Sequence, residues 1–192
     1  MTDQLRVYFH YRSPYSRLAL HQLQEADITT RIDTKLYVLS RSAGEDKGPD
    51  PTRTPARMNY IMQDVPRMTA LTGLRVRPPR AIDIDWTTAH QHFYGLGDAG
   101  DQLRFATALS NARWGNGKDI SETDVIDAVL KETGLPCAPI EASEVKSRLR
   151  RDQEMVEKDL IFGVPFAILD RDGQKEPFFG QDRIGLLLER IV

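Results

Sequence analysis

The tetrapeptide Ser13-Pro14-Tyr15-Ser16 combines residue types that can hold an anion at the start of a helix. Ser13 is a favoured N-cap residue, and Pro14 suits the first helical position, where an amide hydrogen would have no partner. A serine hydroxyl beside the positive end of a helix can donate a hydrogen bond to an anion. The tetrapeptide therefore predicts a ligand site, although a serine that only caps a helix would leave the same pattern.

Two elements must position this tetrapeptide. The segment Leu5–Phe9 is rich in aromatic and apolar residues, which predicts a buried strand. Leu18, Ala19, Leu20 and Leu23 follow at helical spacing, which predicts a helix after Ser13 that runs to about Glu25. We expect Ser13 at the junction where the strand ends and the helix begins.

The remainder of the first half predicts one strand, one loop and one helix. Apolar residues alternate over Ile28–Leu39, which favours a second strand. The segment Ser40–Met58 is rich in glycine and proline and long for a simple connection, so we expect a lid or binding loop. A helix should follow over Met58–Thr72, and Pro78-Pro79 marks a boundary.

The second half predicts a helical block and then a return to strands. Residues from Trp86 to about Leu160 are helical in pattern. Val164–Leu169 and Glu176–Phe179 predict two strands joined by a turn, and Ile184–Ile191 predicts a last helix. This order, β-α-β, helices, β-β-α, predicts an α/β fold with a thioredoxin-like domain of residues 1–77 and 161–192 and an inserted α-helical domain of residues 78–160.

Composition limits the class of protein. The 192 residues carry a net charge of −2, so neither nucleic acid nor an anionic membrane surface is an expected partner. No apolar run reaches the roughly 18 residues that a membrane span needs, and the N-terminus shows no secretory signal. One cysteine, Cys137, excludes an internal disulfide framework. We expect a cytoplasmic protein.

Three motifs carry a resemblance to a known family. They are Tyr8-Phe9-x-x-x-Ser13-Pro14-Tyr15-Ser16, Gly163-Val164-Pro165-Phe166 and Phe179-Gly180-Gln181-Asp182-Arg183. Together they resemble the DsbA-like thioredoxin-fold family that contains kappa-class glutathione transferases and 2-hydroxychromene-2-carboxylate isomerases. The pattern Tyr60-x-x-x-Asp64-x-x-Arg67 also matches, so the resemblance covers nearly the whole chain. It implies glutathione as cofactor, a small and aromatic second substrate, and a homodimer.

The resemblance implies a catalytic role for Ser13. Redox relatives open the first helix with a Cys-x-x-Cys pair, but serines occupy both positions here, Ser13 and Ser16. Disulfide exchange through a cysteine of this chain is therefore excluded at the site. If the sulfur comes from glutathione, the Ser13 hydroxyl would hydrogen-bond to it and favour the thiolate, which is the nucleophilic form.

The other motifs would hold the rest of glutathione. The resemblance implies a cis Val164–Pro165 bond and pairing of the Val164 main chain with the cysteinyl part. Amide groups and side chains of Gln181, Asp182 and Arg183 would hold the γ-glutamyl end. The family places a lysine near the end of the long loop, where this chain has Arg57, with Arg53 as a rival.

Several residues are candidates for the second-substrate pocket. These are Tyr15 and Trp86 as aromatic walls and Arg12 and Arg17 as cations that flank the tetrapeptide. His10 is close enough in sequence to border the site. His90 and His92 have no nearby cysteine, so we expect them on a solvated surface and expect no metal site.

Two functions follow from the sequence. The first is a glutathione-dependent enzyme that either isomerises 2-hydroxychromene-2-carboxylate-type substrates or conjugates electrophiles to the thiol. The alternative is a non-enzymatic module that keeps the thioredoxin-like groove to bind an extended peptide or a small molecule.

Overall fold

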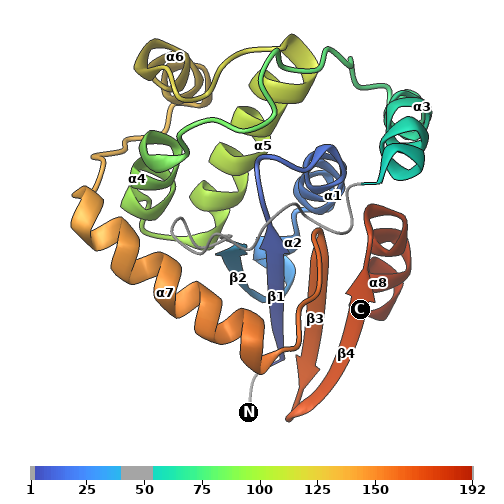
Figure 1. Cartoon of the computed structure of the whole chain (residues 1–192). Coiled ribbons are helices and arrows are strands. Elements are labelled where there is room, and N and C mark those ends of the chain that lie inside the picture. The colour runs from blue at the N-terminus through green and yellow to red at the C-terminus, as the bar shows by residue number, and fades with distance from the viewer. Residues whose placement is uncertain (1–2, 40–53, 192) are drawn as a thin grey trace.

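The computed structural model describes residues 3–39 and 54–191, in which helices cover both faces of a four-stranded sheet (Figure 1). The elements occur in the order β1 (Gln4–Phe9), α1 (Pro14–Glu25), α2 (Ile28–Arg31), β2 (Asp33–Val38), α3 (Pro55–Leu71), α4 (Thr87–Gly95), α5 (Ala99–Asn116), α6 (Thr123–Thr133), α7 (Ala142–Lys158), β3 (Phe166–Arg171), β4 (Gln174–Phe179), the 3-10 turn η1 (Gln181–Arg183) and α8 (Ile184–Arg190).

The sheet has the strand order β2-β1-β3-β4. β1 runs parallel to β2 and antiparallel to β3, so that Val7 lies between Leu36 and Ala167. β3 and β4 form a hairpin around Asp172 and Gly173, which both have positive φ angles. An Asp-Gly pair suits this turn, since a two-residue hairpin loop needs left-handed backbone at both positions.

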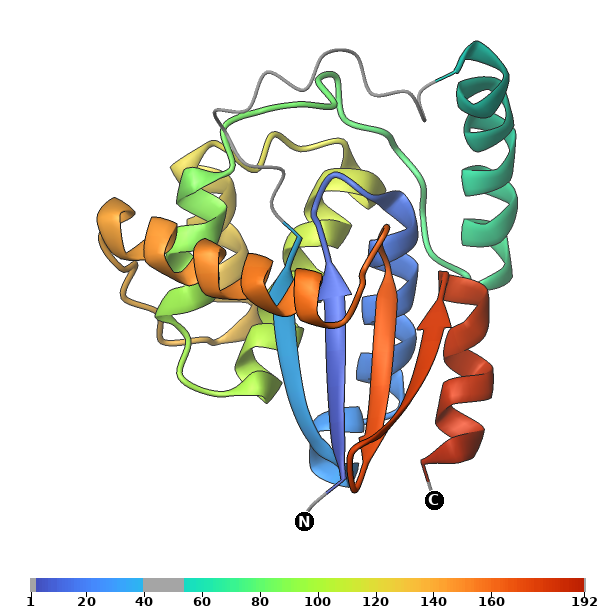
Figure 2. The same ribbon diagram turned by 60° about the horizontal axis from the view of Figure 1, so that its bottom comes forward.

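The two faces of the sheet bury separate cores, because successive side chains of a strand point to opposite sides. Leu5, Val7 and Phe9 of β1 belong to the larger core, which also includes α1 and α8 residues. Tyr8 faces the other way and belongs to a smaller core with Val156 of α7. Figure 2 shows α7 crossing this face of the sheet, with α1 on the opposite side.

Helices α4, α5 and α6 share the larger core with the sheet. Phe93 of α4, Leu109 of α5 and Ile126 of α6 are all buried in the same cluster as Val7. This packing fixes these three helices against the face of the sheet that carries α1. The division into domains at residues 78 and 160 stays a prediction.

The fold class and most elements agree with the sequence. β1, α1, the β3–β4 hairpin and the last helix lie within a few residues of their predicted bounds, and the α/β thioredoxin-like fold is confirmed. One prediction is wrong: Ile28–Arg31 forms a short helix, and the second strand begins only at Asp33. Ile28 and Ile32 are four residues apart, a spacing that also places two side chains on one helix face.

The boundary between the long loop and its helix also changes. α3 begins at Pro55, three residues earlier than predicted, because Thr54 caps it by accepting a hydrogen bond from the Arg57 amide. The rest of the predicted lid or binding loop falls on residues 40–53, outside the described residues, as does Arg53. Within the described parts of the chain, no helix has the length and apolar character that a membrane span requires.

Candidate functional site

Ser13 caps the first helix and contacts a second motif. Its Oγ accepts a hydrogen bond from the Ser16 amide at 3.1 Å, as an N-cap side chain does, and donates to the Val164 carbonyl oxygen at 3.5 Å. The first turn of α1 carries no acidic residue. The positive end of the helix dipole is therefore not neutralised locally, and it favours an anion near the Ser13 hydroxyl.

The three sequence motifs meet around this hydroxyl. The Val164–Pro165 peptide bond is cis. The Gly180 amide donates to the Pro165 carbonyl at 3.0 Å, which joins the start of β3 to the start of η1. A Cβ on Gly163 would lie 3.1 Å from the Phe179 ring, closer than an ordinary van der Waals contact. Segments more than 150 residues apart thus form one site.

The motif at η1 has one buried and two exposed side chains. Gln181 is buried, and its side-chain and main-chain oxygens both accept hydrogen bonds from Gln22 Nε2 at 3.2 Å. Gln181 therefore holds η1 against α1. Asp182 and Arg183 are half exposed and form an ion pair with each other at 2.7 Å, so an incoming ammonium or carboxylate group would have to compete with that pair.

A cavity of about 1190 Å³ opens beside Ser13. Its wall is mostly apolar and comes from the β1–α1 loop, α3, the segment before α4, and α7. Six of the predicted site residues line it: Arg12, Ser13, Tyr15, Arg57, Trp86 and Val164. Lys146 of α7 also lines the cavity and is a cation that the sequence did not single out.

Tyr15 reaches across to α3 through Asp64. Its Oη donates to Asp64 Oδ2 at 2.8 Å, while Tyr60 Oη and Arg67 Nη1 donate to the other carboxylate oxygen at 3.1 and 3.0 Å. Burial, followed by the hydrogen bond to Asp64, raises the pKa of Tyr15 above its ordinary value. The phenol stays neutral and serves as a fixed donor that attaches the α3 wall of the cavity.

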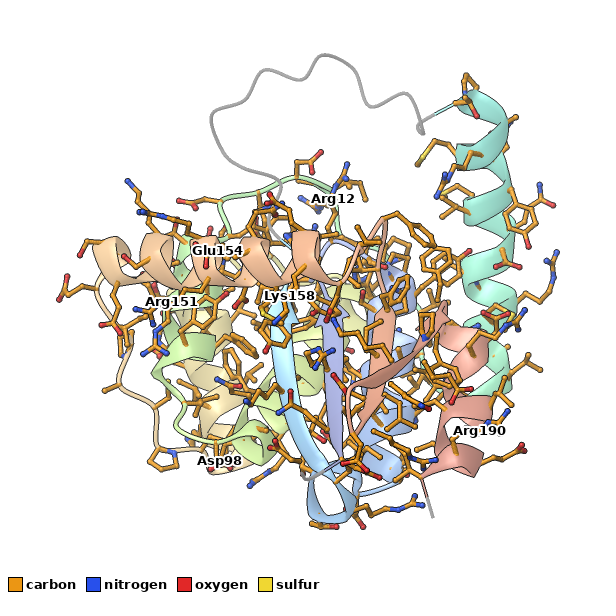
Figure 3. All side chains as sticks on the ribbon, turned by 90° about the horizontal axis from the view of Figure 1, so that it is seen from below. Arg12, Asp98, Arg151, Glu154, Lys158 and Arg190 are labelled. Atoms are coloured by element: carbon orange, nitrogen blue, oxygen red, sulfur yellow. The ribbon has the colours of Figure 1, made fainter. Side chains whose placement is uncertain are left out.

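The two arginines near the tetrapeptide have different positions. Arg12 lines the cavity and pairs through Nε with Asp83 Oδ1 at 2.6 Å. In Figure 3 it lies at the end of the molecule opposite Asp98 and Arg190. Arg17 is buried, and its Nε donates to Asn111 Oδ1 at 2.7 Å. The structure therefore corrects the prediction for Arg17, whose side chain packs between α1 and α5 instead of lining the pocket.

The positions of His90 and His92 differ from those predicted from the sequence. His90 and His92 are both buried in α4, so the prediction of a solvated surface is wrong. α4 packs between α5 and α7, and this tertiary packing leaves no trace in the spacing of two histidines. His10 and His90 line the cavity, and their ring centroids are 6.1 Å apart.

A buried cation lies behind the aromatic wall. The Arg113 guanidinium carbon is 4.8 Å from the centroid of the Trp86 ring, and Nη2 donates to the carbonyl oxygens of Ala81 and Ile82 at 2.9 and 2.7 Å. Burial lowers the pKa of Arg113 to about 10, so it remains charged at neutral pH. This contact fixes the segment before α4, which carries Trp86 into the cavity wall.

Cys137 lies apart from these groups. Its Sγ donates to the His92 carbonyl oxygen at 3.0 Å, and burial raises the pKa of its thiol. A half-buried thiol with a raised pKa is a poor nucleophile. Because this is the one cysteine of the chain, a thiolate at Ser13 must come from another molecule.

Solved structures share the whole architecture. A 2-hydroxychromene-2-carboxylate isomerase is 20% identical with a TM-score of 0.70, and the alignment covers 97% of this chain and 93% of that one. The cytosolic disulfide reductase DsbM from Pseudomonas aeruginosa is 18% identical with a TM-score of 0.69, covering 97% of each chain. The same reductase with glutathione gives 16% identity and a TM-score of 0.65, covering 97% of this chain and 98% of that one. At these identities the likeness concerns the fold.

Sequence comparisons give the family. No curated protein matches the sequence. The model of the DSBA-like thioredoxin domain, by contrast, matches residues 4–192, almost the complete chain. The strand order, the serine-capped α1 and the cis proline that opens β3 lie within this match. The chain therefore belongs to the DSBA-like thioredoxin domain family.

Proposed function

We propose that the protein is an enzyme that binds glutathione and uses its thiolate as a nucleophile. The observation that carries the proposal is the position of Ser13 Oγ, at the N-terminus of α1 and 3.5 Å from the Val164 carbonyl, in a chain whose one cysteine lies elsewhere. Such a site has the groups that stabilise a thiolate and lacks a thiolate of its own.

The residues present fit a γ-glutamyl tripeptide. The Ser13 hydroxyl has rotational freedom, since its hydrogen makes only a 3.5 Å contact with Val164, and it can turn toward a sulfur. The main chain of Val164 and Pro165 would pair with the cysteinyl part. Gln181 keeps η1 in place, so that Asp182 and Arg183 would hold the γ-glutamyl end. Arg57 would supply the cation for the glycyl carboxylate.

The cavity has room for a second molecule. Its volume of about 1190 Å³ exceeds the range of roughly 300–1,000 Å³ that is usual for a single small ligand. The wall is apolar and aromatic at Trp86, which suits an aromatic substrate. When bound, glutathione would supply a nucleophilic sulfur, and the chain would orient both molecules and lower the pKa of the thiol through Ser13.

The reaction is then either an isomerisation or a conjugation. An isomerase would take a conjugated substrate of the 2-hydroxychromene-2-carboxylate type and release the thiol unchanged, while a transferase would leave the electrophile attached to sulfur. The similar fold of the isomerase supports the first reaction, and that of the reductase with glutathione supports a glutathione site. A cytoplasmic location is proposed with it, since the cytosol maintains a reduced glutathione pool. A homodimer is proposed from the family resemblance alone.

Calorimetric titration of glutathione into the purified protein tests the proposal. We expect saturable binding at millimolar concentration or below, with a thiol pKa that is lowered in wild type and not in Ser13→Ala. Absence of binding, with wild type and Ser13→Ala indistinguishable, would reject it. Binding without turnover of any electrophile would favour the non-enzymatic binding module instead.

A further inference from the structure

His10 lies at the site without a role in holding glutathione. It is three residues before Ser13, and the Ser13 amide donates to the His10 carbonyl at 3.0 Å, which turns the chain so that both residues line the cavity. Its ring packs edge-on against Trp86, with centroids 4.8 Å apart. The imidazole is therefore held between the helix N-terminus and the aromatic wall.

The tautomer of His10 follows from one hydrogen bond. The Arg12 amide donates to His10 Nδ1 at 2.9 Å. An amide hydrogen can bind only a lone pair, so Nδ1 is unprotonated and the ring hydrogen of the neutral imidazole is on Nε2. In the described chain, Nδ1 is the ring nitrogen of His10 that takes part in a hydrogen bond. The cavity thus receives a donor whose partner is not part of the described chain.

The surroundings keep this imidazole neutral. Burial, the nearby His90 ring and the Arg113 guanidinium lower the pKa of His10 to about 3. Burial likewise lowers the pKa of His90 to about 4, against the opposing effect of Asp85. No third His, Cys, Asp or Glu in the described ranges joins the two rings to form a metal site.

Arg113 adds positive potential behind the donor. It is completely buried and lies against Trp86, which His10 also contacts. Its Nε and Nη1 have no hydrogen-bond partner in the described structure, and the charges of Asp119 and Asp83 act on it without such a bond. Negative charge that develops on an atom bound to His10 Nε2 would be stabilised in a buried, low-dielectric place.

We propose that His10 is a catalytic hydrogen-bond donor that binds the carbonyl oxygen of the conjugated second substrate. The inference rests on the proposed function. As a bond forms between sulfur and the β-carbon, the electron pair of the C=C bond moves toward the carbonyl, and the oxygen becomes an enolate oxygen. His10 Nε2–H and the field of Arg113 stabilise that charge.

The electron pair then returns by one of two routes. In an isomerisation, rotation about the former double bond is followed by reformation of C=C and departure of the thiolate. In a conjugation, water protonates the α-carbon and the C–S bond remains. A neutral imidazole suits this role, since it donates a hydrogen bond without having to lose a full proton.

Two electrophiles, one with a carbonyl oxygen and one without oxygen, test the proposal. Variants His10→Leu and His10→Gln are compared with wild type, using an α,β-unsaturated ketone and benzyl chloride as the second substrate. The ketone gathers charge on oxygen during thiolate attack, whereas benzyl chloride releases chloride and has no oxygen. His21→Gln is the matched control, because His21 lies on α1 and does not line the cavity.

We expect His10→Leu to slow the ketone reaction on the order of 100-fold, the usual effect of removing one donor to an oxyanion. Glutathione affinity and the benzyl chloride reaction should stay as in wild type. His10→Gln should recover part of the ketone rate, because its amide N–H lies near the position of Nε2. An equal loss with both electrophiles, or no loss with either, would overturn the proposal.

A second readout does not depend on turnover or on the folding of a variant. Nitrogen-15 NMR of wild type should show His10 as a neutral ring with its hydrogen on Nε2 at neutral pH. A charged ring, or a hydrogen on Nδ1, would overturn the role of His10 alone. Failure of wild type to bind glutathione would reject the proposed function as well, so the two failures are distinguishable.

Discussion

Tyr15 Oη donates a 2.8 Å hydrogen bond to Asp64 Oδ2 and thereby joins the first turn of α1 to the middle of α3. This contact matters because α3 buries few of its residues, namely Asp64, Val65 and Thr69. Figures 1 and 2 show α3 at the edge of the molecule, beside α1. A polar contact therefore attaches an element that forms much of the cavity wall.

Replacing Asp64 by Asn should loosen α3 before the rest of the protein unfolds. The variant loses the charge that three donors share, and we expect a cost of about 1–3 kcal/mol, as for hydrogen bonds to charged groups. Hydrogen exchange in α3 should accelerate more than exchange in β1. Asp101→Asn is the control, since Asp101 pairs with Arg104 at the same i,i+3 spacing on α5. Equal rates of hydrogen exchange in α3 of Asp64→Asn and Asp101→Asn would contradict the prediction.

Ser13→Ala should have two separable effects. Loss of the N-cap should cost about 1 kcal/mol of stability, measured by urea unfolding, and loss of the hydroxyl should raise the pKa of the bound glutathione thiol, measured by thiolate absorbance against pH. Asp98→Ala is the matched control: Asp98 caps α5 by accepting from the Asp101 amide and lies far from the cavity. The prediction fails if Asp98→Ala shifts the thiol pKa equally.

Arg57→Gln should weaken glutathione binding about 10-fold or more, because a charge-assisted contact with the glycyl carboxylate is lost. The monoethyl ester at the glycyl carboxylate provides the test, since it lacks that charge. Wild type and Arg57→Gln should bind the ester with similar affinity in calorimetry. If Lys146→Gln shows this behaviour and Arg57→Gln does not, the cation is Lys146.

Asp152 should make stability depend on pH. Burial raises the pKa of its carboxyl to about 6, against the hydrogen bonds from Tyr94 Oη and the Val38 amide at 2.6 and 2.7 Å. A raised folded-state pKa means that the stabilisation is complete below the unfolded value and is lost as the pH rises through about 6.

The free energy of unfolding of Asp152→Asn should therefore rise relative to that of wild type as the pH increases from about 4 to about 7. We expect this relative increase to be on the order of 2 kcal/mol. Urea unfolding across this range measures the difference between the two proteins. Asp127→Asn, on the exposed surface of α6, serves as the control. A constant difference between Asp152→Asn and wild type at every pH would show that Asp152 does not titrate in this range.

Local sequence patterns predicted the helix start at Ser13 but not the side chains that surround it. Ser13 and Pro14 start α1 as expected, because capping depends on residues next to each other in sequence. Tyr60, Asp64 and Arg67 share a helix face by spacing, but their partner Tyr15 is 49 residues away from Asp64. The burial of Arg17, His90 and His92 likewise depends on long-range packing, which no local spacing encodes.

The contacts of Asp159, beside the smaller core, could not be predicted from the sequence either. Asp159 is surrounded by Arg6, Tyr8 and Lys175, which donate to its carboxylate at 2.6–2.7 Å. Although burial opposes it, these donors lower the pKa of Asp159. In the sequence the four residues are parts of β1, β4 and the end of α7, with nothing to mark them as neighbours.

The weak attachment of α3 has a consequence for engineering. The proposed thiolate-binding groups, the Ser13 hydroxyl and the Val164 main chain, lie just before α1 and β3. Met58, Ile61 and Met62 of α3 give the cavity part of its shape. Because α3 contributes little to the core, its cavity-facing positions can be randomised at small cost in folding. A library restricted to these three positions would change which electrophiles are accepted and leave the chemistry at Ser13 intact.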